Sequence, residues 1–337
     1  AIPPAVLSAN ENPLGPSPKA IAAYGEAIHL NRYPDGGATQ LRQTLATQFG
    51  LDVNRIVCGA GSDELITLLI RCYVGPGDEV LQTQHGFLMY GITAKTVGAT
   101  PVLAPETPDL HTDVDALLAC VTDKTRICFV ANPNNPTGTY IPGSELRRLR
   151  DGLREDILLV IDAAYSEYVD ASDYSDGCDL VEDYQNVVML RTFSKLYGLA
   201  ALRLGWCYAP EAVVDALNRV RSPFNVNNSA QAAGIAALGD QDHVEISLAQ
   251  NAEQLKRLCG ALSQLGLGFP PSVCNFVLIR FNDADTAKRA LSHLADQGVI
   301  VRSVAGYGLA ESLRATIGTA AENDRLIAGL TDFMNKG

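Results

Sequence analysis

Short apolar runs alternate with helical patterns along most of the first 240 residues, and no other feature of the sequence constrains the fold as strongly. Short apolar runs bounded by turn residues are typical of strands buried on both faces, as in a parallel sheet. Segments with apolar residues at every third or fourth position are typical of the helices that cover such a sheet. We therefore predict an α/β domain around a mostly parallel sheet. The predicted strands are 55–58, 79–82, 100–103, 126–131, 158–162, 187–192 and 205–208, and the predicted helices are 62–72, 90–97 and 143–152.

The pattern changes after Gly239, where a long helical stretch over 243–265 begins a different arrangement. It predicts a smaller α+β domain with strands 276–280, 299–304 and 312–317 and helices 284–297 and 322–334. At the other end, the prolines between Asn10 and Pro18 exclude regular helix and central strand there, because proline fixes φ and removes a donor. We expect an N-terminal arm (1–30), a large domain (31–241) and a small domain (242–337).

Composition excludes several classes of function. The formal net charge of −12 and the absence of a Lys/Arg cluster argue against binding of nucleic acid. No long uncharged apolar run occurs, so we expect a soluble protein with no membrane partner. The eight cysteines are scattered and the five histidines form no HExxH pair, which predicts no metal site and reduced thiols in a cytoplasmic protein.

A lysine follows the predicted strand 187–192, in the segment Thr192-Phe193-Ser194-Lys195. The carboxyl ends of parallel strands are where α/β proteins place ligands, and a lysine held there can form a Schiff base. Thr192, Ser194 and Arg203 offer hydroxyl and guanidinium donors to a phosphate. Taken alone, a lysine near a serine is more often part of a solvated loop, so the neighbouring strands decide its meaning.

Two other strand ends carry polar groups that could hold the ring of a bound ligand. Asp162 closes the strand 158–162, and a buried carboxylate needs a partner such as a protonated pyridine nitrogen. Tyr165, three residues later, and Asn135, in the rigid loop after strand 126–131, could hydrogen-bond the ring hydroxyl. An aspartate that merely caps the next helix is the alternative for Asp162.

The segment from Gly59 to Glu64 joins a strand to a helix, where free backbone N–H groups and the helix dipole favour an anion. Gly61 and Ser62 are therefore candidates for a phosphate contact, and a plain tight turn with a serine cap is the alternative. Glu64 stands where a dinucleotide fingerprint needs its third glycine, and no GxxxxGK[ST] motif occurs, so a nucleotide-binding protein is not expected.

Together the motifs resemble the fold-type I pyridoxal-phosphate-dependent aminotransferases, and within them the histidinol-phosphate aminotransferase group. The resemblance covers nearly the whole chain, and several motifs in order are more specific than any single one. These motifs are Asn10-Glu11-Asn12-Pro13, Tyr33-Pro34-Asp35-Gly36, Asn134-Asn135-Pro136-Thr137-Gly138, Asp162-Ala163-Ala164-Tyr165, Ser194-Lys195-Leu196-Tyr197-Gly198-Leu199 and Leu313-Arg314.

The resemblance implies a role for each cofactor residue. Lys195 would bind the cofactor as a Schiff base and later carry the proton, Asp162 would meet the ring nitrogen, and Phe87 would stack on the ring, with ordinary core packing as the alternative for Phe87. Asn135 and Tyr165 would meet the ring hydroxyl. The residues implied around the phosphate are Gly61, Ser62, Thr192, Ser194 and Arg203.

The resemblance also implies substrate and subunit contacts. Arg314 would grip the substrate α-carboxylate, and Arg302 and Asn12 would lie near the substrate, although a surface salt bridge is an alternative for Arg302. Tyr33 would reach the cofactor phosphate of a neighbouring subunit, which implies a homodimer with shared active sites.

The expected activity is amino transfer between histidinol phosphate, or a similar donor, and 2-oxoglutarate or glutamate. The alternatives are an aromatic amino acid aminotransferase and a phospho-amino-acid decarboxylase of the same fold. A cofactor-binding regulator without turnover is a further class, which the acidic charge disfavours. The sequence departs from the family at His85-Gly86, Thr139-Tyr140 and Ala201, none of which is expected to contact the cofactor, so these changes bear on the choice of amino donor.

Overall fold

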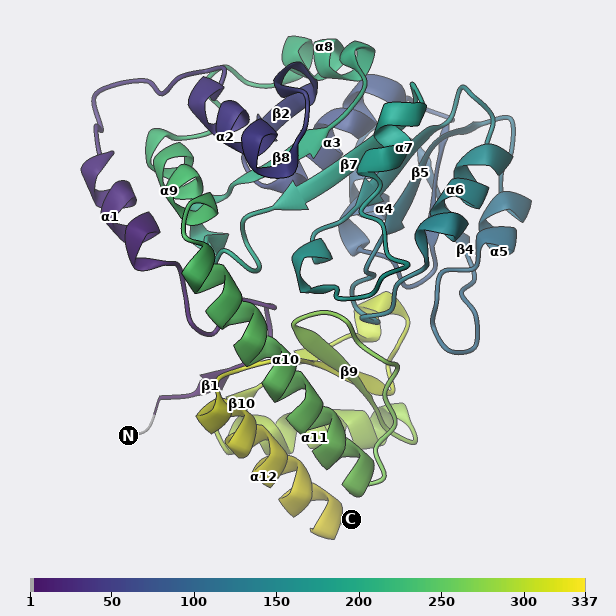
Figure 1. Cartoon of the computed structure of the whole chain (residues 1–337). Coiled ribbons are helices and arrows are strands. Elements are labelled where there is room, and N and C mark those ends of the chain that lie inside the picture. The colour runs from purple at the N-terminus through teal and green to yellow at the C-terminus, as the bar shows by residue number, and fades with distance from the viewer. Residues whose placement is uncertain (1–2, 337) are drawn as a thin grey trace.

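A seven-stranded sheet forms the centre of the computed structural model, which describes residues 3–336 (Figure 1). Six strands run parallel, and β8 alone is antiparallel to both of its neighbours. The carboxyl ends of the parallel strands therefore meet at one edge. In spatial order the strands are β2 (Ile56–Gly59), β8 (Gly205–Tyr208), β7 (Val187–Thr192), β6 (Leu158–Asp162), β5 (Thr125–Ala131), β3 (Glu79–Thr83) and β4 (Thr100–Ala104).

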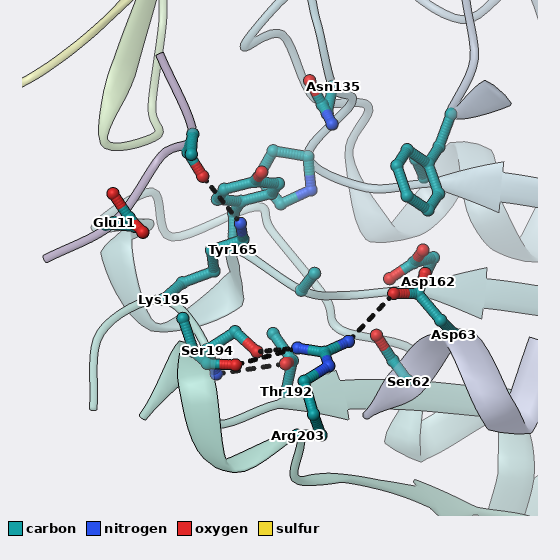
Figure 2. Close-up of a pocket in the computed structure, with 16 residues that line it drawn as sticks. Glu11, Ser62, Asp63, Asn135, Asp162, Tyr165, Thr192, Ser194, Lys195 and Arg203 are labelled. Atoms are coloured by element: carbon teal, nitrogen blue, oxygen red, sulfur yellow. Dashed lines mark hydrogen bonds and ion pairs between the residues drawn. The ribbon is translucent and has the colours of Figure 1, made fainter. Parts of the chain in front are cut away.

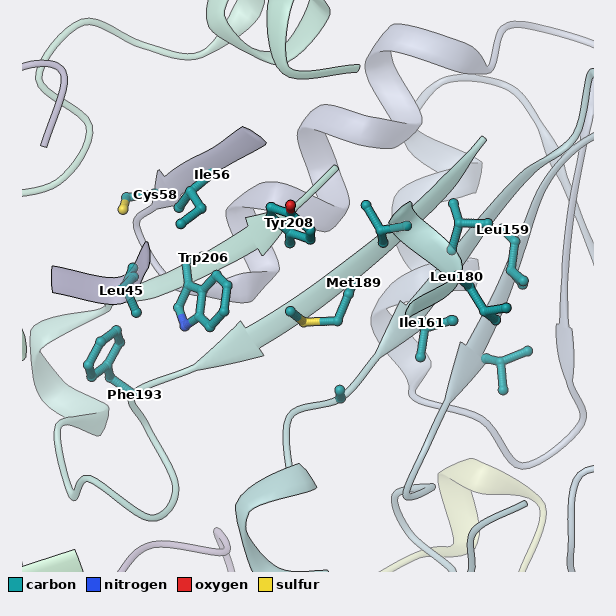
Figure 3. Close-up of a cluster of buried hydrophobic side chains, with 14 of the residues drawn as sticks. Leu45, Ile56, Cys58, Leu159, Ile161, Leu180, Met189, Phe193, Trp206 and Tyr208 are labelled. Carbon is teal, nitrogen blue, oxygen red and sulfur yellow. The ribbon is translucent and has the colours of Figure 1, made fainter. Parts of the chain in front are cut away.

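Helices bury both faces of this sheet. Successive residues of β5 and β6 belong to two different apolar clusters: Cys128 and Leu159 to one, and Phe129 and Val160 to the other. Figure 3 shows part of the first cluster, around Met189 and Trp206. The helices on that face are α2 (Thr39–Phe49), α5 (Val114–Ala119), α6 (Gly143–Gly152), α7 (Cys178–Asp183) and α9 (Asn228–Leu238), and those on the other are α3 (Ser62–Tyr73), α4 (Leu88–Thr96) and α8 (Glu211–Val220).

The C-terminal part forms a third core of its own at the other end of the molecule (Figure 1). A small antiparallel sheet in the order β11-β12-β9 packs against long helices. Its elements are α10 (Gln241–Gln264), β9 (Phe276–Arg280), α11 (Ala284–Asp296), β10 (Val299–Ile300), β11 (Arg302–Ser303), β12 (Ser312–Thr316) and α12 (Ala320–Lys336). Four short 3₁₀ turns complete the described part: η1 (Val53–Arg55), η2 (Ser166–Tyr168), η3 (Ala200–Leu202) and η4 (Ala305–Tyr307).

The N-terminal segment connects the two parts. Its strand β1 (Ala5–Val6) pairs with β10, and the Asn10 N–H donates to Thr316 Oγ1 at 2.9 Å. It then turns into α1 (Pro18–Glu26), which lies along α9. Proline suits the first turn of a helix, and Ser17 caps this one by accepting from the Ala20 N–H at 3.1 Å.

One expectation about these elements was wrong. The strand predicted over 299–304 is two short strands, because the chain changes pairing partner at Val301: β10 pairs with β1, and β11 pairs with β12. The exclusion of helix between Asn10 and Pro18 holds up to Ser17, and α1, which begins at Pro18, was not predicted. The expected domain boundaries at residues 30 and 241 stay predictions. Within residues 3–336, no helix is both long and apolar enough to cross a membrane.

Candidate active site

A cavity of about 260 Å³ opens at the carboxyl edge of the large sheet, where most of the predicted site residues converge (Figure 2). Parallel neighbours place their strand ends side by side, so residues far apart in the sequence meet there. The predicted residues that line the cavity are Ser62, Phe87, Asn135, Asp162, Tyr165, Thr192, Ser194, Lys195 and Arg203. Gly61 adjoins it through Ser62, whereas Tyr33, Asn12, Arg302 and Arg314 are not among the lining residues.

Lys195 presents its amine to the cavity from the loop after β7. The Nζ atom lies 5.7 Å from the centre of the Tyr165 ring and donates to the Ala9 carbonyl at 3.3 Å. Burial, followed by the positive charge of Arg314, lowers the pKa of Lys195 to about 8. About a tenth of the amine is therefore neutral at pH 7, far more than for an ordinary lysine, and the neutral amine is the nucleophilic form that attacks an aldehyde.

Asp162, the last residue of β6, is a buried carboxylate with one partner. Its Oδ2 accepts from the Tyr90 hydroxyl at 2.7 Å, and its Oδ1 has no hydrogen-bond partner within residues 3–336. Burial raises the pKa of Asp162 to about 6, although the Tyr90 hydrogen bond acts in the opposite direction. A buried carboxylate oxygen without a partner is costly, and a protonated ring nitrogen in the cavity would supply the missing donor.

Tyr165 and Asn135 are each held by a second residue. The Tyr165 hydroxyl accepts from Asn10 Nδ2 at 2.9 Å, and burial raises the pKa of that hydroxyl. Asn135 Oδ1 accepts from Arg314 Nη1, which leaves the Asn135 amide N–H groups available to the cavity. Both side chains can therefore donate to one acceptor, as the ring hydroxyl of the cofactor in its ionised form requires.

The other end of the cavity suits a phosphate. The guanidinium group of Arg203 lines this end of the cavity. Its Nη2 atom lies 3.1 Å from Asp63 Oδ2, and its Nη1 atom donates to the Ala200 carbonyl at 3.0 Å. Helix α3 begins at Ser62, which lines the cavity, and has no side-chain cap, so its first N–H groups and the helix dipole add positive potential there. Gly61 has φ +84°, and a Cβ built on it would lie 2.7 Å from Arg203 Nη2, so this position needs glycine.

Phe87 borders the cavity where the chain enters α4. Its ring packs edge-on against Tyr90, with centroids 5.6 Å apart, and Tyr90 in turn stacks on Phe129. This packing fixes the orientation of Phe87, which lines the same cavity as Asp162 and Asn135.

The remaining predicted residues lie around the cavity or away from it. Arg314, on β12, is buried behind Asn135 and also donates to the Ser8 carbonyl at 2.9 Å. Arg302, on β11, is exposed and stands directly opposite Arg314 in the strand register. Asn12 Nδ2 donates to the Leu196 carbonyl at 2.7 Å and to Ser247 Oγ at 3.1 Å, so its side chain ties the N-terminal segment to the lysine loop.

Tyr33 lies on the surface, 83% exposed, and stacks on Phe224 with centroids 4.6 Å apart. The substrate roles of Asn12, Arg302 and Arg314 and the subunit role of Tyr33 stay predictions.

Sequence reasoning missed four residues that act on the site. Tyr90 stands one helical turn after Phe87, a spacing that could have placed both on one side of α4. Asn10 and Asp63 lie inside recognised motifs and could have been assigned from them. Tyr307, which acts on Arg314 and Asn135, lies in the short turn η4 of the C-terminal part and carries no local signal.

The sequence matches the family model for aminotransferase class I and II over residues 4–330. The chain belongs to this family. It is 57% identical to a histidinol-phosphate aminotransferase of Paramagnetospirillum magneticum over 97% of this chain and 91% of that protein. A histidinol-phosphate aminotransferase of Rhodospirillum centenum is 53% identical, again over 97% and 91% of the two chains.

Among solved structures, the crystal structure of histidinol-phosphate aminotransferase from Sinorhizobium meliloti in complex with pyridoxal-5′-phosphate superposes with a TM-score of 0.93 at 30% identity. That match covers 99% of this chain and 92% of the other.

Proposed function

We propose that this aminotransferase uses pyridoxal 5′-phosphate to transfer the amino group of histidinol phosphate to 2-oxoglutarate. One observation carries the cofactor assignment: the cavity that holds the Lys195 amine also holds Asp162, whose buried Oδ1 lacks a partner within residues 3–336. Pyridoxal 5′-phosphate has the group that each of these residues needs. Its aldehyde can react with the Lys195 amine, its ring nitrogen can pair with the Asp162 carboxylate, and its phosphate can pair with Arg203. The relatives named above are aminotransferases, which favours transfer over decarboxylation.

The bound cofactor supplies an electron-withdrawing ring that stabilises negative charge at the substrate Cα. Asp162 keeps the ring nitrogen protonated, and Tyr90 holds the orientation of that carboxylate through its hydroxyl. The Lys195 amine would take the proton from the donor Cα, because its lowered pKa of about 8 lets it accept and return a proton near neutral pH.

The pairing of Arg302 with Arg314 supports an anionic substrate. The two residues stand directly opposite each other on β11 and β12, and like charges in this position destabilise a sheet. Burial, with a contribution from Arg302, lowers the pKa of Arg314. An anion between the two guanidinium groups would relieve both effects. Histidinol phosphate offers a phosphate ester there and glutamate offers carboxylates, so one pair of arginines can serve both substrates.

We also propose a homodimer in the cytoplasm. Tyr33 and Phe224 form a stacked aromatic pair at the surface, and Leu30, which precedes Tyr33 in the sequence, is 96% exposed. Exposed apolar groups of this size mark contact surfaces. The eight cysteines, all within the described residues, are free thiols, which fits a reducing compartment.

The test uses the purified protein saturated with pyridoxal phosphate and 2-oxoglutarate, with a panel of amino donors. We expect glutamate formation with a kcat/KM at least tenfold higher for L-histidinol phosphate than for L-phenylalanine, L-tyrosine or L-aspartate. Lys195→Ala is the control for non-enzymatic transfer. A higher kcat/KM for an aromatic donor would replace the proposed substrate, and release of CO₂ from a phospho-amino acid would replace the proposed reaction.

A further inference from the structure

A buried histidine–glutamate pair connects the large sheet to the C-terminal part beside the active site. His85 follows β3, two residues before Phe87, and Glu106 lies in the loop after β4. Their side chains are 11% and 2% exposed. Neither residue lines the cavity, and His85 belongs to a motif that departs from the family.

The contacts of the pair run from one part of the molecule to the other. The His85 backbone N–H donates to Glu106 Oε1 at 2.9 Å, so the glutamate fixes the loop that carries Phe87. The His85 Nδ1 atom lies 2.6 Å from the carbonyl oxygen of Tyr307, in the turn η4. His85 Nε2 lies 3.7 Å from Glu106 Oε2.

These contacts define which ring nitrogen of His85 carries the hydrogen. A carbonyl oxygen only accepts, so Nδ1 is the donor to Tyr307. Nε2 then faces Glu106 Oε2, a buried oxygen with no hydrogen-bond partner within residues 3–336. Burial raises the pKa of the Glu106 carboxyl. Through Nδ1, His85 is held as a directed donor to Tyr307.

The turn that receives this hydrogen bond lies between the two strands that carry the substrate arginines. Chain order is Arg302 on β11, then η4 with Tyr307, then Arg314 on β12. Burial raises the pKa of the Tyr307 hydroxyl, while Arg314, Arg302 and the Asn135 amide lower it, so that hydroxyl faces the arginines. Gly308, at φ +81°, packs directly on His85: a Cβ built there would lie 3.3 Å from the imidazole Cε1.

We propose that His85 and Glu106 are positioning residues that seat the η4 turn, and with it Tyr307 and Arg314, against the amino-donor side of the active site. The inference rests on the proposed function insofar as Arg314 binds the amino donor. It does not depend on which donor is used. The His85 side chain is directed at Tyr307 and Gly308, so its hydrogen bond acts on donor binding, whereas Glu106 also holds the loop that carries Phe87.

Two amide substitutions separate the two nitrogen positions of His85. The amide nitrogen of His85→Asn occupies the place of Nδ1 and can still donate to the Tyr307 carbonyl. That of His85→Gln occupies the place of Nε2 and leaves the carbonyl without its donor. The matched control is His293→Gln, because His293 lies on α11 in an ion pair with Asp332, away from the cavity.

The measurement titrates each variant twice. Apoprotein is titrated with pyridoxal phosphate, and the loaded protein is titrated with L-glutamate while the cofactor absorbance reports conversion to the amino form. We expect His85→Gln to weaken the apparent glutamate affinity by about tenfold, the effect of one lost hydrogen bond near a buried site. We expect His85→Asn to stay within about threefold of wild type, and cofactor affinity to change by less than about threefold in both variants.

Gly308→Ala tests the same contact from the other side, should His85→Gln fail to fold. Its added methyl group at positive φ displaces the turn from His85, so donor affinity is again expected to fall while cofactor affinity is kept. The proposal is overturned if either perturbing variant leaves glutamate affinity unchanged, if cofactor affinity falls as much as donor affinity, or if His85→Asn is as impaired as His85→Gln. A wild-type protein that converts glutamate but rejects histidinol phosphate would refute the proposed substrate and leave this inference standing.

Discussion

Asp162 is expected to destabilise the cofactor-free protein while making cofactor binding possible. Its pKa rises from 3.8 to about 6 in the folded chain, a shift of about two units. At 1.36 kcal/mol per unit this corresponds to about 3 kcal/mol of disfavoured ionisation. We therefore expect Asp162→Asn to remove a cost that the wild-type apoprotein bears whenever the carboxylate is charged.

The sign of the pH dependence follows from the raised pKa. Between 3.8 and about 6 the folded state binds more protons at Asp162 than the unfolded state does, so wild-type stability falls as pH rises through this window. The loss is nearly complete about one pH unit above the folded pKa and is constant beyond that. About half of it, roughly 1.5 kcal/mol, falls between pH 5 and pH 8, where the protein can be handled.

The substitution keeps the size of the side chain and the hydrogen bond from Tyr90, since the asparagine Oδ1 can accept it. The new amide N–H groups are partly unsatisfied, which costs about 1–3 kcal/mol but does not vary with pH. The diagnostic quantity is therefore the change of the stability difference with pH, and not its value at one pH.

The assay is urea unfolding of the apoproteins at pH 5, 6, 7 and 8, with Asp296→Asn, an exposed aspartate on α11, as the matched control. The variant should gain about 1.5 kcal/mol over wild type from pH 5 to pH 8, and the control should gain nothing. With cofactor added, the order reverses, because the asparagine cannot keep the ring nitrogen protonated. A stability difference that is flat with pH would refute the argument that burial strains the Asp162 carboxylate.

Two further predictions concern the cofactor. The rate at which the apoprotein binds pyridoxal phosphate should rise with pH up to about 8 and level off above it, because only the neutral Lys195 amine is nucleophilic. Stopped-flow absorbance at a series of pH values measures this rate. A rate independent of pH from 6 to 9 would contradict the prediction. Arg203→Gln should weaken cofactor affinity by about 10- to 100-fold, because it removes a charge-assisted hydrogen bond to the phosphate. Asp63→Asn should weaken the affinity far less, because the Arg203 guanidinium remains. Equal losses of affinity in equilibrium titrations would place the phosphate elsewhere.

Local patterns in the sequence were enough to predict the class of fold and the chemistry of the site. Buried strands such as β5 and β6 are apolar along nearly their whole length, which is typical of a sheet covered on both faces, and polar residues at their ends mark the ligand edge. Each of these signals lies within a few residues of a strand end, so the sequence alone assigns Asp162, Asn135 and Lys195 to one cavity. The family resemblance then identified the cofactor.

Tertiary structure decided what depends on contacts between distant segments. No local pattern could show that Tyr90 donates to Asp162 or that Arg314 donates to the Asn135 side-chain oxygen, because the two partners lie far apart along the chain. Nor could a local pattern show that β10 and β11 are separate strands, because they pair in different sheets. The sequence determined which groups stand at each strand end. The tertiary structure determined which atoms of these groups have hydrogen-bond partners in the protein and which are left for a ligand. Asp162 Oδ1 has no such partner among residues 3–336. The reason is that a hydrogen bond depends on distance in space and not on order along the chain.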